Sequence, residues 1–242
     1  MRYKIKIAYD GSNFYGFQKQ VGKRTIEEEI EKVLSSINDN AVKITGAGRT
    51  DSKVNAIGQV AHFDLEKNIS CYKLKGALNS YLPDDIYISS VEEVNGDFHA
   101  RYMVKSKTYK YMINIGEYNP LLRNQAYQYC KTLDIKNMQK AIKYLIGKHD
   151  FTSFSSAQDK RSDKIREIYD AKIEYNDSII TITFIGKGFL KYQVRCMVGT
   201  LMKVGENKIS PIDVKKILEQ KDRTKAGKTA PSNGLTLIDV KY

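Results

Sequence analysis

The stretch Arg2-Tyr3-Lys4-Ile5-Lys6-Ile7-Ala8-Tyr9 places tyrosine or isoleucine at every second position, with basic residues at three of the positions between them. A period of two is typical of a β-strand that buries one face and exposes the other. The buried face of such a strand needs a covering layer. The start of the chain therefore predicts a layered fold that contains a one-sided sheet.

Helical and extended patterns alternate along the rest of the chain. Apolar residues recur at helical spacing from Ile26 to Ile37, after the capping-box pattern Thr25-x-x-Glu28. Further on, the sequence predicts a strand over 108–115, a helix capped by Asp134, a hairpin that turns at 176–178, and a helix over 189–204.

This alternation predicts an α+β fold of two similar halves that share an extended sheet. We place the N-terminal half at residues 1–104, where it carries the loop with Asp51. The C-terminal half then spans residues 105–242.

The composition favours a polyanionic partner. The chain has 242 residues, and 40 lysines and arginines against 28 acidic residues give it a net charge of +12. Such an excess is typical of proteins that bind nucleic acid and, second, of proteins that bind anionic membrane surfaces.

Several classes of protein are excluded by the sequence. No apolar run approaches the roughly 18–20 residues that span a bilayer, and charged residues interrupt the start where a signal peptide needs an apolar core. The cysteines and histidines are too scattered for a disulfide framework or a metal motif; they are Cys71, Cys130, Cys196, His62, His99 and His149. The sequence predicts a reduced cytoplasmic protein without a metal.

The segment from Gly46 to Ser52 is the densest candidate for chemistry. Its Gly-x-Gly follows a predicted strand, but the third glycine of a dinucleotide fingerprint would fall on Asp51, whose carboxylate would repel a pyrophosphate. Two interpretations of Asp51 remain. It is either a turn or cap residue, or a carboxylate that an arginine such as Arg49 keeps ionised for use as a nucleophile or base.

Metal-dependent nuclease chemistry fits this segment poorly. Such a site needs clustered carboxylates, and Asp51 is the one acidic residue between Asn40 and Phe63. If the segment is catalytic, it favours a mechanism with a single carboxylate and no cofactor.

Several collinear motifs make the chain resemble the tRNA pseudouridine synthase A family over nearly its whole length. They are YDGSNFYGFQ at 9–18, GRTD at 48–51, GQVAHF at 58–63, FHAR at 98–101, SKTYKY at 106–111, HDFTSF at 149–154, FL at 189–190, VR at 194–195 and AP at 230–231. The chain departs from the family pattern at Lys191-Tyr192-Gln193, before Val194, and at Lys53 and Asn55. Because Lys53 and Asn55 lie beside the candidate site, their departure leaves the range of tRNA targets open.

The resemblance implies the pseudouridine synthase fold, with a mainly antiparallel sheet and helices packed on one side. The second half would complete the active-site cleft. The implied activity is isomerisation of uridine to pseudouridine at positions 38, 39 and 40 of the tRNA anticodon stem and loop, without a cofactor. The implied partners are tRNA and a second copy of the chain in a homodimer.

The resemblance also assigns roles to four residues. Asp51 takes the place of the catalytic carboxylate, as covalent nucleophile or as acid/base group. Tyr109 matches the tyrosine that stacks on the target base, and Arg195 matches the arginine that pairs with the carboxylate. Arg49 would displace the target nucleotide or bind its phosphate. Tyr111, by contrast, is expected to be a core residue.

Two other functions remain as alternatives. A non-catalytic RNA-binding protein of related fold would share the basic charge but would lack the nucleophile or its arginine partner. A metal-dependent nuclease would lose its activity in a chelator.

Overall fold

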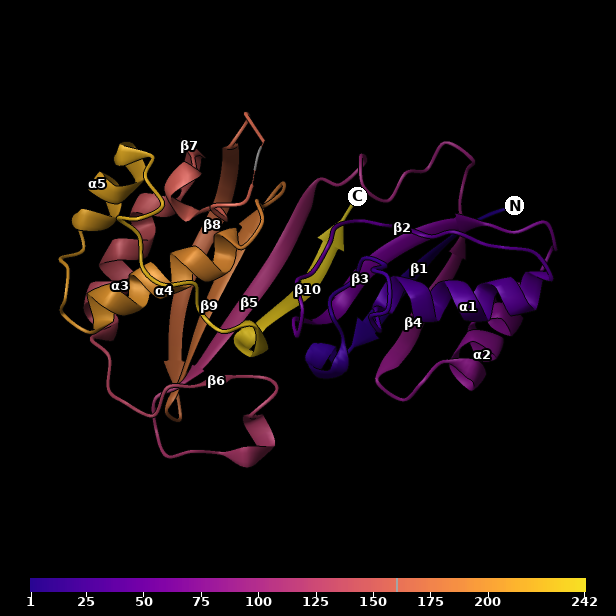
Figure 1. Cartoon of the computed structure of the whole chain (residues 1–242), viewed down its shortest axis with the longest axis horizontal. Helices are drawn as coiled ribbons and strands as arrows, with labels where there is room; N and C mark the ends of the chain where they lie inside the picture. Colours follow the sequence, from indigo (N-terminus) through magenta and orange to yellow (C-terminus); the bar gives the residue numbers. More distant parts are fainter. Residues whose placement is uncertain (160) are drawn as a thin grey trace. The chain divides into compact units, whose positions relative to one another are not determined.

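The computed structural model of the chain describes residues 1–159 and 161–242 (Figure 1). The chain divides into two compact units: unit 1 comprises Met1–Lys105 and Leu237–Tyr242, and unit 2 comprises Ser106–Thr236. The boundary that we place from the sequence lies between residues 104 and 105. The C-terminal segment Leu237–Tyr242, which that boundary assigns to the second half, belongs to unit 1.

Unit 1 is a sheet with two helices. β4, β1 and β3 pair in that order and antiparallel, with β10 beside β3 and the short β2 on β3. The elements are β1 (Arg2–Tyr9), α1 (Ile26–Asn38), β2 (Thr45–Gly46), β3 (Asn55–Asp64), α2 (Cys71–Tyr81), β4 (Ile86–Glu93), β10 (Leu235–Lys241) and the 3-10 turn η1 (Gly11–Asn13). The first two residues of β10 belong to unit 2.

The first strand has the one-sided burial that its sequence predicts. Tyr3, Ile5 and Ile7 are fully buried, whereas Lys4 and Lys6 on the other face are only partly covered. The two helices lie on one face of these strands in Figure 1, and α1 contacts α2. The buried face is therefore the face that the helices cover.

Unit 2 repeats this arrangement with different elements. β5, β9, β8 and β7 pair in that order and antiparallel, and β6 pairs parallel to β5. The elements are β5 (Ser106–Asn114), β6 (Tyr127–Gln128), α3 (Ile135–Ile142), β7 (Gly147–Asp150), β8 (Ile165–Asn176), β9 (Ile179–Gly186), α4 (Gln193–Gly205), α5 (Asp213–Gln220) and the 3-10 turns η2 (Pro120–Leu122), η3 (Lys143–Leu145), η4 (Thr152–Phe154) and η5 (Ser232–Gly234).

Helices α3, α4 and α5 build the core of unit 2. α3 packs against β8, α4 and α5. α4 is buried along most of its length, and Met197, Val198 and Leu201 have no exposed surface. The mixed α/β class with a mainly antiparallel sheet is confirmed.

Some local predictions are confirmed and one boundary is wrong. β8 and β9 form the predicted hairpin, whose turn residues Asp177 and Ser178 have positive φ, and the Asp134 side chain caps α3 by accepting from the Asn137 N–H at 2.9 Å. α4, however, begins at Gln193 instead of residue 189. Tyr192 before it is left-handed, with φ +64°, so the helix cannot extend further back.

The capping box predicted at Thr25 is also wrong. Thr25 is the residue before α1, but its side chain makes no capping bond and its hydroxyl is buried without a partner among the described residues. The first N–H groups of the helix bind backbone instead: Ile26 donates to the Gly16 carbonyl at 3.3 Å and Glu27 to the Phe17 carbonyl at 2.9 Å. A tertiary contact therefore replaces the local cap.

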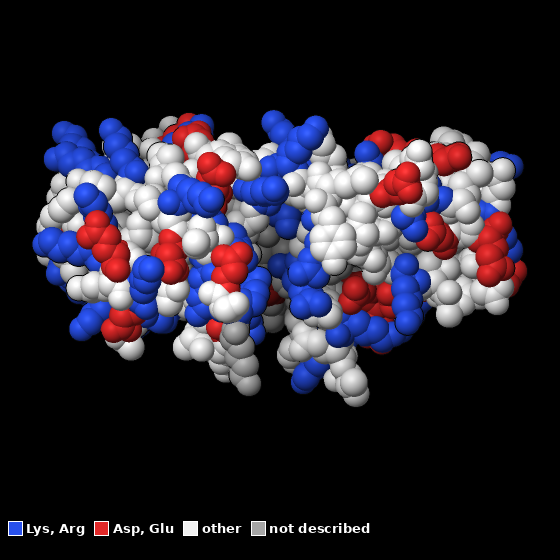
Figure 2. Space-filling view, turned by 90° about the horizontal axis from the view of Figure 1, so that it is seen from above, with Lys and Arg blue, Asp and Glu red and all other residues white. Residues whose placement is uncertain are grey.

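The excess positive charge resides almost entirely in unit 2. Between residues 106 and 236 the sequence has 24 lysines and arginines against 13 acidic residues, a net charge of +11. The residues of unit 1 have 16 against 15, a net charge of +1. Figure 2 shows basic and acidic side chains interspersed over the visible face. The asymmetry belongs to the units and not to a single run of lysines.

Candidate active site

Asp51 lies in unit 1, in the loop that connects β2 to β3. Its side chain is half-buried, between the buried Thr50 and the exposed Ser52. The Val54 N–H donates to the Asp51 carbonyl at 3.2 Å, and Lys53 within this turn has φ +63°. The backbone of the loop thus forms a tight turn that begins at the carboxylate residue.

The segment 14–17 holds this loop from one side. The Phe17 N–H donates to the Thr50 carbonyl at 3.1 Å, and the Lys53 N–H donates to the Phe14 carbonyl at 3.2 Å. Gly16 has φ +102°, and a Cβ at this position would lie 2.8 Å from the Thr50 carbonyl oxygen. The close approach of the two segments therefore requires glycine at position 16.

Buried polar side chains hold the loop from the other side. The hydroxyls of Tyr9 and Thr50 hydrogen-bond at 2.7 Å, and the Gln59 side-chain amide donates to the Gly48 carbonyl at 2.9 Å. Burial raises the pKa of Tyr9 to about 12, so its hydroxyl keeps its proton at neutral pH. The backbone on both sides of Asp51 is fixed by neighbours, and the carboxylate is presented on a pre-organised loop.

Arg49 lies on the same loop and is exposed. The structure thus places Arg49 and Asp51 two residues apart in unit 1, with the buried Thr50 between them. Tyr109 and Arg195 belong to unit 2.

Tyr109 points to the buried face of β5. It is 8% exposed, and its ring packs edge-to-face on Phe189, with 5.2 Å between the ring centroids. Tyr111, two residues further along the strand, has no exposed surface, which confirms it as a core residue.

Arg195 projects from the first turn of α4 and is half-buried. Its Nε donates to the Ala230 carbonyl at 2.8 Å, and its guanidinium lies 5.0 Å from the centre of the Tyr192 ring. The neighbouring Pro231 carbonyl accepts from the Tyr111 hydroxyl at 2.7 Å. Residues 230 and 231 therefore connect the arginine to the buried tyrosine of β5.

The electrostatics of Tyr111 agree with this geometry. Burial raises the pKa of Tyr111 strongly, and the positive charge of Arg195 opposes part of that rise. The Tyr111 hydroxyl stays protonated and donates to Pro231. The segment from Phe189 to Tyr192 contacts both predicted residues of unit 2, since Tyr109 packs on its first ring and Arg195 on its last.

The sequence does not indicate the supporting role of Tyr9 and Gln59. The alternation in the first strand predicts that Tyr9 is buried, and a buried tyrosine hydroxyl usually has a hydrogen-bond partner. The sequence therefore predicts that the Tyr9 hydroxyl has a hydrogen-bond partner, but it does not identify that partner. Only the fold brings Thr50 and Gly48 to these side chains.

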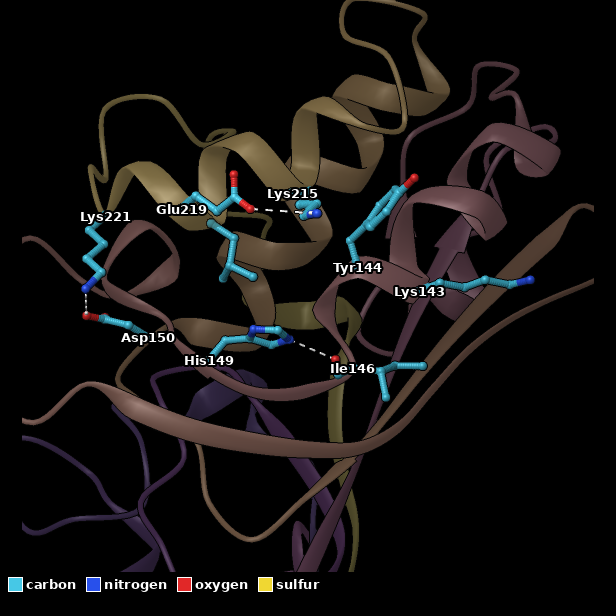
Figure 3. A pocket seen from close by; sticks show the side chains of 9 residues that line it. Lys143, Tyr144, Ile146, His149, Asp150, Lys215, Glu219 and Lys221 are labelled. Carbon is cyan, nitrogen blue, oxygen red and sulfur yellow. Dashed lines mark hydrogen bonds and ion pairs between the residues drawn. The ribbon is translucent and has the colours of Figure 1, made fainter.

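A pocket of about 360 Å³ lies elsewhere in unit 2, where η3 and β7 face α5 (Figure 3). Charged side chains around the pocket form ion pairs with one another: Lys221 pairs with Asp150 at 3.2 Å, and Lys215 pairs with Glu219 at 3.9 Å. The lining residues, none of which is a predicted site residue, are Lys143, Tyr144, Ile146, His149, Asp150, Lys215, Leu218, Glu219 and Lys221.

The described part of the chain offers neither a metal cluster nor a membrane-spanning helix. Within residues 1–159 and 161–242, no three side chains of His, Cys, Asp or Glu gather as a metal site would require. The helices in the same part of the chain are too short or too polar to cross a membrane.

Comparison with known proteins supplies a family. The family model described as tRNA pseudouridine synthase matches residues 5–103 and 141–242. The tRNA pseudouridine synthase A of Streptococcus uberis is 47% identical, over 100% of this chain and 98% of the relative. Those of Streptococcus agalactiae serotype III and Anoxybacillus flavithermus are 48% and 45% identical, again over 100% of this chain and over 95% and 98% of the relatives.

One solved structure has a weaker similarity. The crystal structure of a Cbf5-Nop10-Gar1 complex aligns with a TM-score of 0.36 and 12% identity, over 98% of this chain and 58% of that chain. A score this low does not establish a common fold, and the family assignment depends on the sequence similarity alone.

Proposed function

The chain belongs to the tRNA pseudouridine synthase family, and on that premise we propose that it isomerises uridine to pseudouridine at positions 38, 39 and 40 of the tRNA anticodon stem and loop. The observation that carries this proposal is the similarity to tRNA pseudouridine synthase A over 100% of the chain. The fixed loop that presents Asp51 supports it, because a carboxylate held in place suits attack on a positioned nucleotide.

The proposed reaction rearranges the nucleotide without adding or removing heavy atoms. The N1–C1′ bond breaks, the uracil turns, and a C5–C1′ bond forms, after which C5 loses its proton and N1 carries one. Asp51 acts on C1′ of the ribose or on C6 of the base, as a covalent nucleophile or as an acid/base group. Both routes need one carboxylate and no redox step.

The other three residues have supporting roles in this proposal. Tyr109 stacks on the target base and replaces part of the stacking that the base loses when it leaves the helix. Arg195 pairs with the carboxylate of Asp51 and keeps it ionised. Its bond to Ala230 and its packing on Tyr192 support this role, because they fix the guanidinium in unit 2. Arg49 binds a phosphate or displaces the target nucleotide.

We further propose that the protein acts in the cytoplasm and as a homodimer, as its family resemblance implies. Analytical ultracentrifugation at micromolar concentration tests the dimer directly. A sedimenting mass equal to a single chain of 27.6 kDa would contradict it.

Tritium release tests the proposed reaction. Unmodified tRNA that carries 5-tritiated uridine is incubated with the protein in the presence of a chelator, and the parent is compared with the Asp51→Ala variant. We expect tritium release that requires Asp51 and is unaffected by the chelator. Binding of tRNA without release would favour a non-catalytic RNA-binding protein, and release abolished by the chelator would contradict the metal-free mechanism.

Removal of the Tyr9 hydroxyl tests whether the loop is pre-organised. Tyr9→Phe deletes the 2.7 Å hydrogen bond to Thr50 next to the carboxylate. We expect kcat to fall about tenfold to hundredfold with KM nearly unchanged, because a small displacement of a catalytic group has an effect of that size. Steady-state tritium release over a range of tRNA concentrations measures both constants.

Tyr3→Phe is the matched control for this variant. Tyr3 lies on the same strand and the same face, is fully buried, and donates its hydroxyl to the Ile69 carbonyl at 2.8 Å, away from the loop. We expect a comparable loss of stability and no change in kcat. Equal activity losses in the two variants would show that Tyr9 acts only through general stability.

A further inference from the structure

The turn that contains the FHAR motif carries a stack of aromatic rings in unit 1. The ring of Tyr102 stacks on His99 with 4.1 Å between centroids and 29° between planes, and His99 lies 4.9 Å from His62. Tyr102 nevertheless remains 78% exposed. The residue after the motif therefore carries a large ring that stacks on His99 and is otherwise open to solvent.

The turn is fixed by its own hydrogen bonds. Nδ1 of His99 accepts from the N–H groups of Arg101 and Tyr102, at 3.2 and 3.3 Å. The peptide groups of Ala100 are held from both directions, because its N–H donates to Nδ1 of His62 at 3.2 Å and its carbonyl accepts from the Tyr242 hydroxyl at 2.7 Å. A ring that is already immobilised loses little further entropy when it binds a ligand.

Burial does not account for the position of Tyr102. Phe98 in the same motif packs on Tyr242 with 5.0 Å between ring centroids and contributes to the core of the turn. Tyr102 leaves most of its surface in water and so gains little stability from apolar burial. A supported but exposed aromatic ring is the arrangement that nucleic-acid-binding proteins use to stack a base.

The residue that precedes Tyr102 in the sequence, Arg101, carries a guanidinium. Arg101 is exposed, and its side chain has no ion pair among the described residues. Other basic side chains of this region are neutralised: Arg2 pairs with Asp64 at 2.8 Å, and Lys4 pairs with Glu92 at 2.7 Å. Arg101 can therefore bind a phosphate.

We propose that residues 98–102 form a stacking surface for an unpaired nucleotide of the RNA substrate, with the base on Tyr102 and a phosphate on Arg101. The proposal rests on the proposed function, since tRNA is the RNA concerned. A protein partner fits less well, because the exposed apolar surface here is limited to Tyr102 and Met103, which is 47% exposed, beside a charged side chain.

Binding of unmodified tRNA to Tyr102→Ala tests this proposal. Fluorescence anisotropy at one fixed salt concentration should show an affinity roughly 5- to 100-fold lower than that of the parent, which is the range for the loss of one stacked base. Tyr102→Phe keeps the ring and should bind like the parent. Arg101→Gln should reduce the slope of log affinity against log salt by about one.

Tyr72→Ala is the matched control. Tyr72 is a tyrosine of unit 1 that is 89% exposed and stacks on no ring among the described residues. Its replacement should leave tRNA affinity unchanged. Because both tyrosines are exposed, we expect neither variant to disturb the fold, which thermal unfolding checks.

The outcomes separate this inference from the proposed function. If the parent releases tritium and Tyr102→Ala binds tRNA like the parent, the stacking surface is wrong and the function stands. If the parent neither binds tRNA nor releases tritium, both are wrong. If Tyr102→Ala changes the sedimenting mass and not the RNA affinity, the ring belongs to a protein interface, which overturns the inference.

Discussion

Asp51→Asn should reduce pseudouridine formation by three orders of magnitude or more, on the order of the effect of removing a catalytic nucleophile. Asparagine has the shape of aspartate but neither its charge nor its nucleophilic oxygen. The fold of the loop should survive, because the hydrogen bonds from Phe17 and Lys53 that hold it are made to backbone carbonyls. Binding of tRNA should therefore remain close to that of the parent.

Single-turnover tritium release and anisotropy measure these two effects separately. Asp10→Asn is the matched control: Asp10 is a nearby carboxylate of unit 1 that accepts from the Ser12 N–H at 2.9 Å, a role that an asparagine oxygen can also fill. We expect it to retain activity. Comparable rates for Asp51→Asn and the parent would remove Asp51 from the mechanism.

The second large effect concerns salt. If about six phosphates are contacted, the affinity for tRNA should fall roughly a thousandfold between 50 and 200 mM monovalent salt, because binding releases counterions from the RNA. The net charge of +11 between residues 106 and 236 predicts that most of these contacts come from unit 2. A flat salt profile would contradict the role of the basic residues.

Single charge removals locate the contacts. Lys191 and Lys228 are exposed and lie on the two segments that hold Arg195, next to Tyr192 and two residues before Ala230. Replacement of either lysine by glutamine should lower the slope of log affinity against log salt by about one. Lys73→Gln, an exposed change on α2 of unit 1, should leave the slope unchanged.

Periodicity predicted the elements better than their ends. One-sided alternation identified the first strand, and the 176–178 turn located the hairpin of β8 and β9. Where a helix ends depends on which hydrogen-bond partners its terminal N–H and C=O groups have outside the helix. At α1 those groups meet the carbonyls of Gly16 and Phe17, a tertiary contact with no local signature.

The candidate site divides in the same way. The GRTD motif makes Asp51 and Arg49 candidates, and motif positions make Tyr109 and Arg195 candidates. The side chains that hold the Asp51 loop could not be predicted, because the hydroxyl of Tyr9 hydrogen-bonds to Thr50 only after the sheet has formed. The charge asymmetry, by contrast, needs only the sequence, because residues 1–104 carry 14 lysines and arginines against 14 acidic residues and the whole excess lies beyond them.

The shared backbone contacts of the 14–17 segment have a consequence for motion. This segment binds the first N–H groups of α1 and the Asp51 loop at the same time. Displacement of the 14–17 segment would therefore disturb the Asp51 loop and the N-terminus of the helix together, so these parts are expected to open as one cooperative unit. We therefore expect the loop to stay closed during turnover, with conformational steps of the reaction arising in the RNA or in another part of the protein.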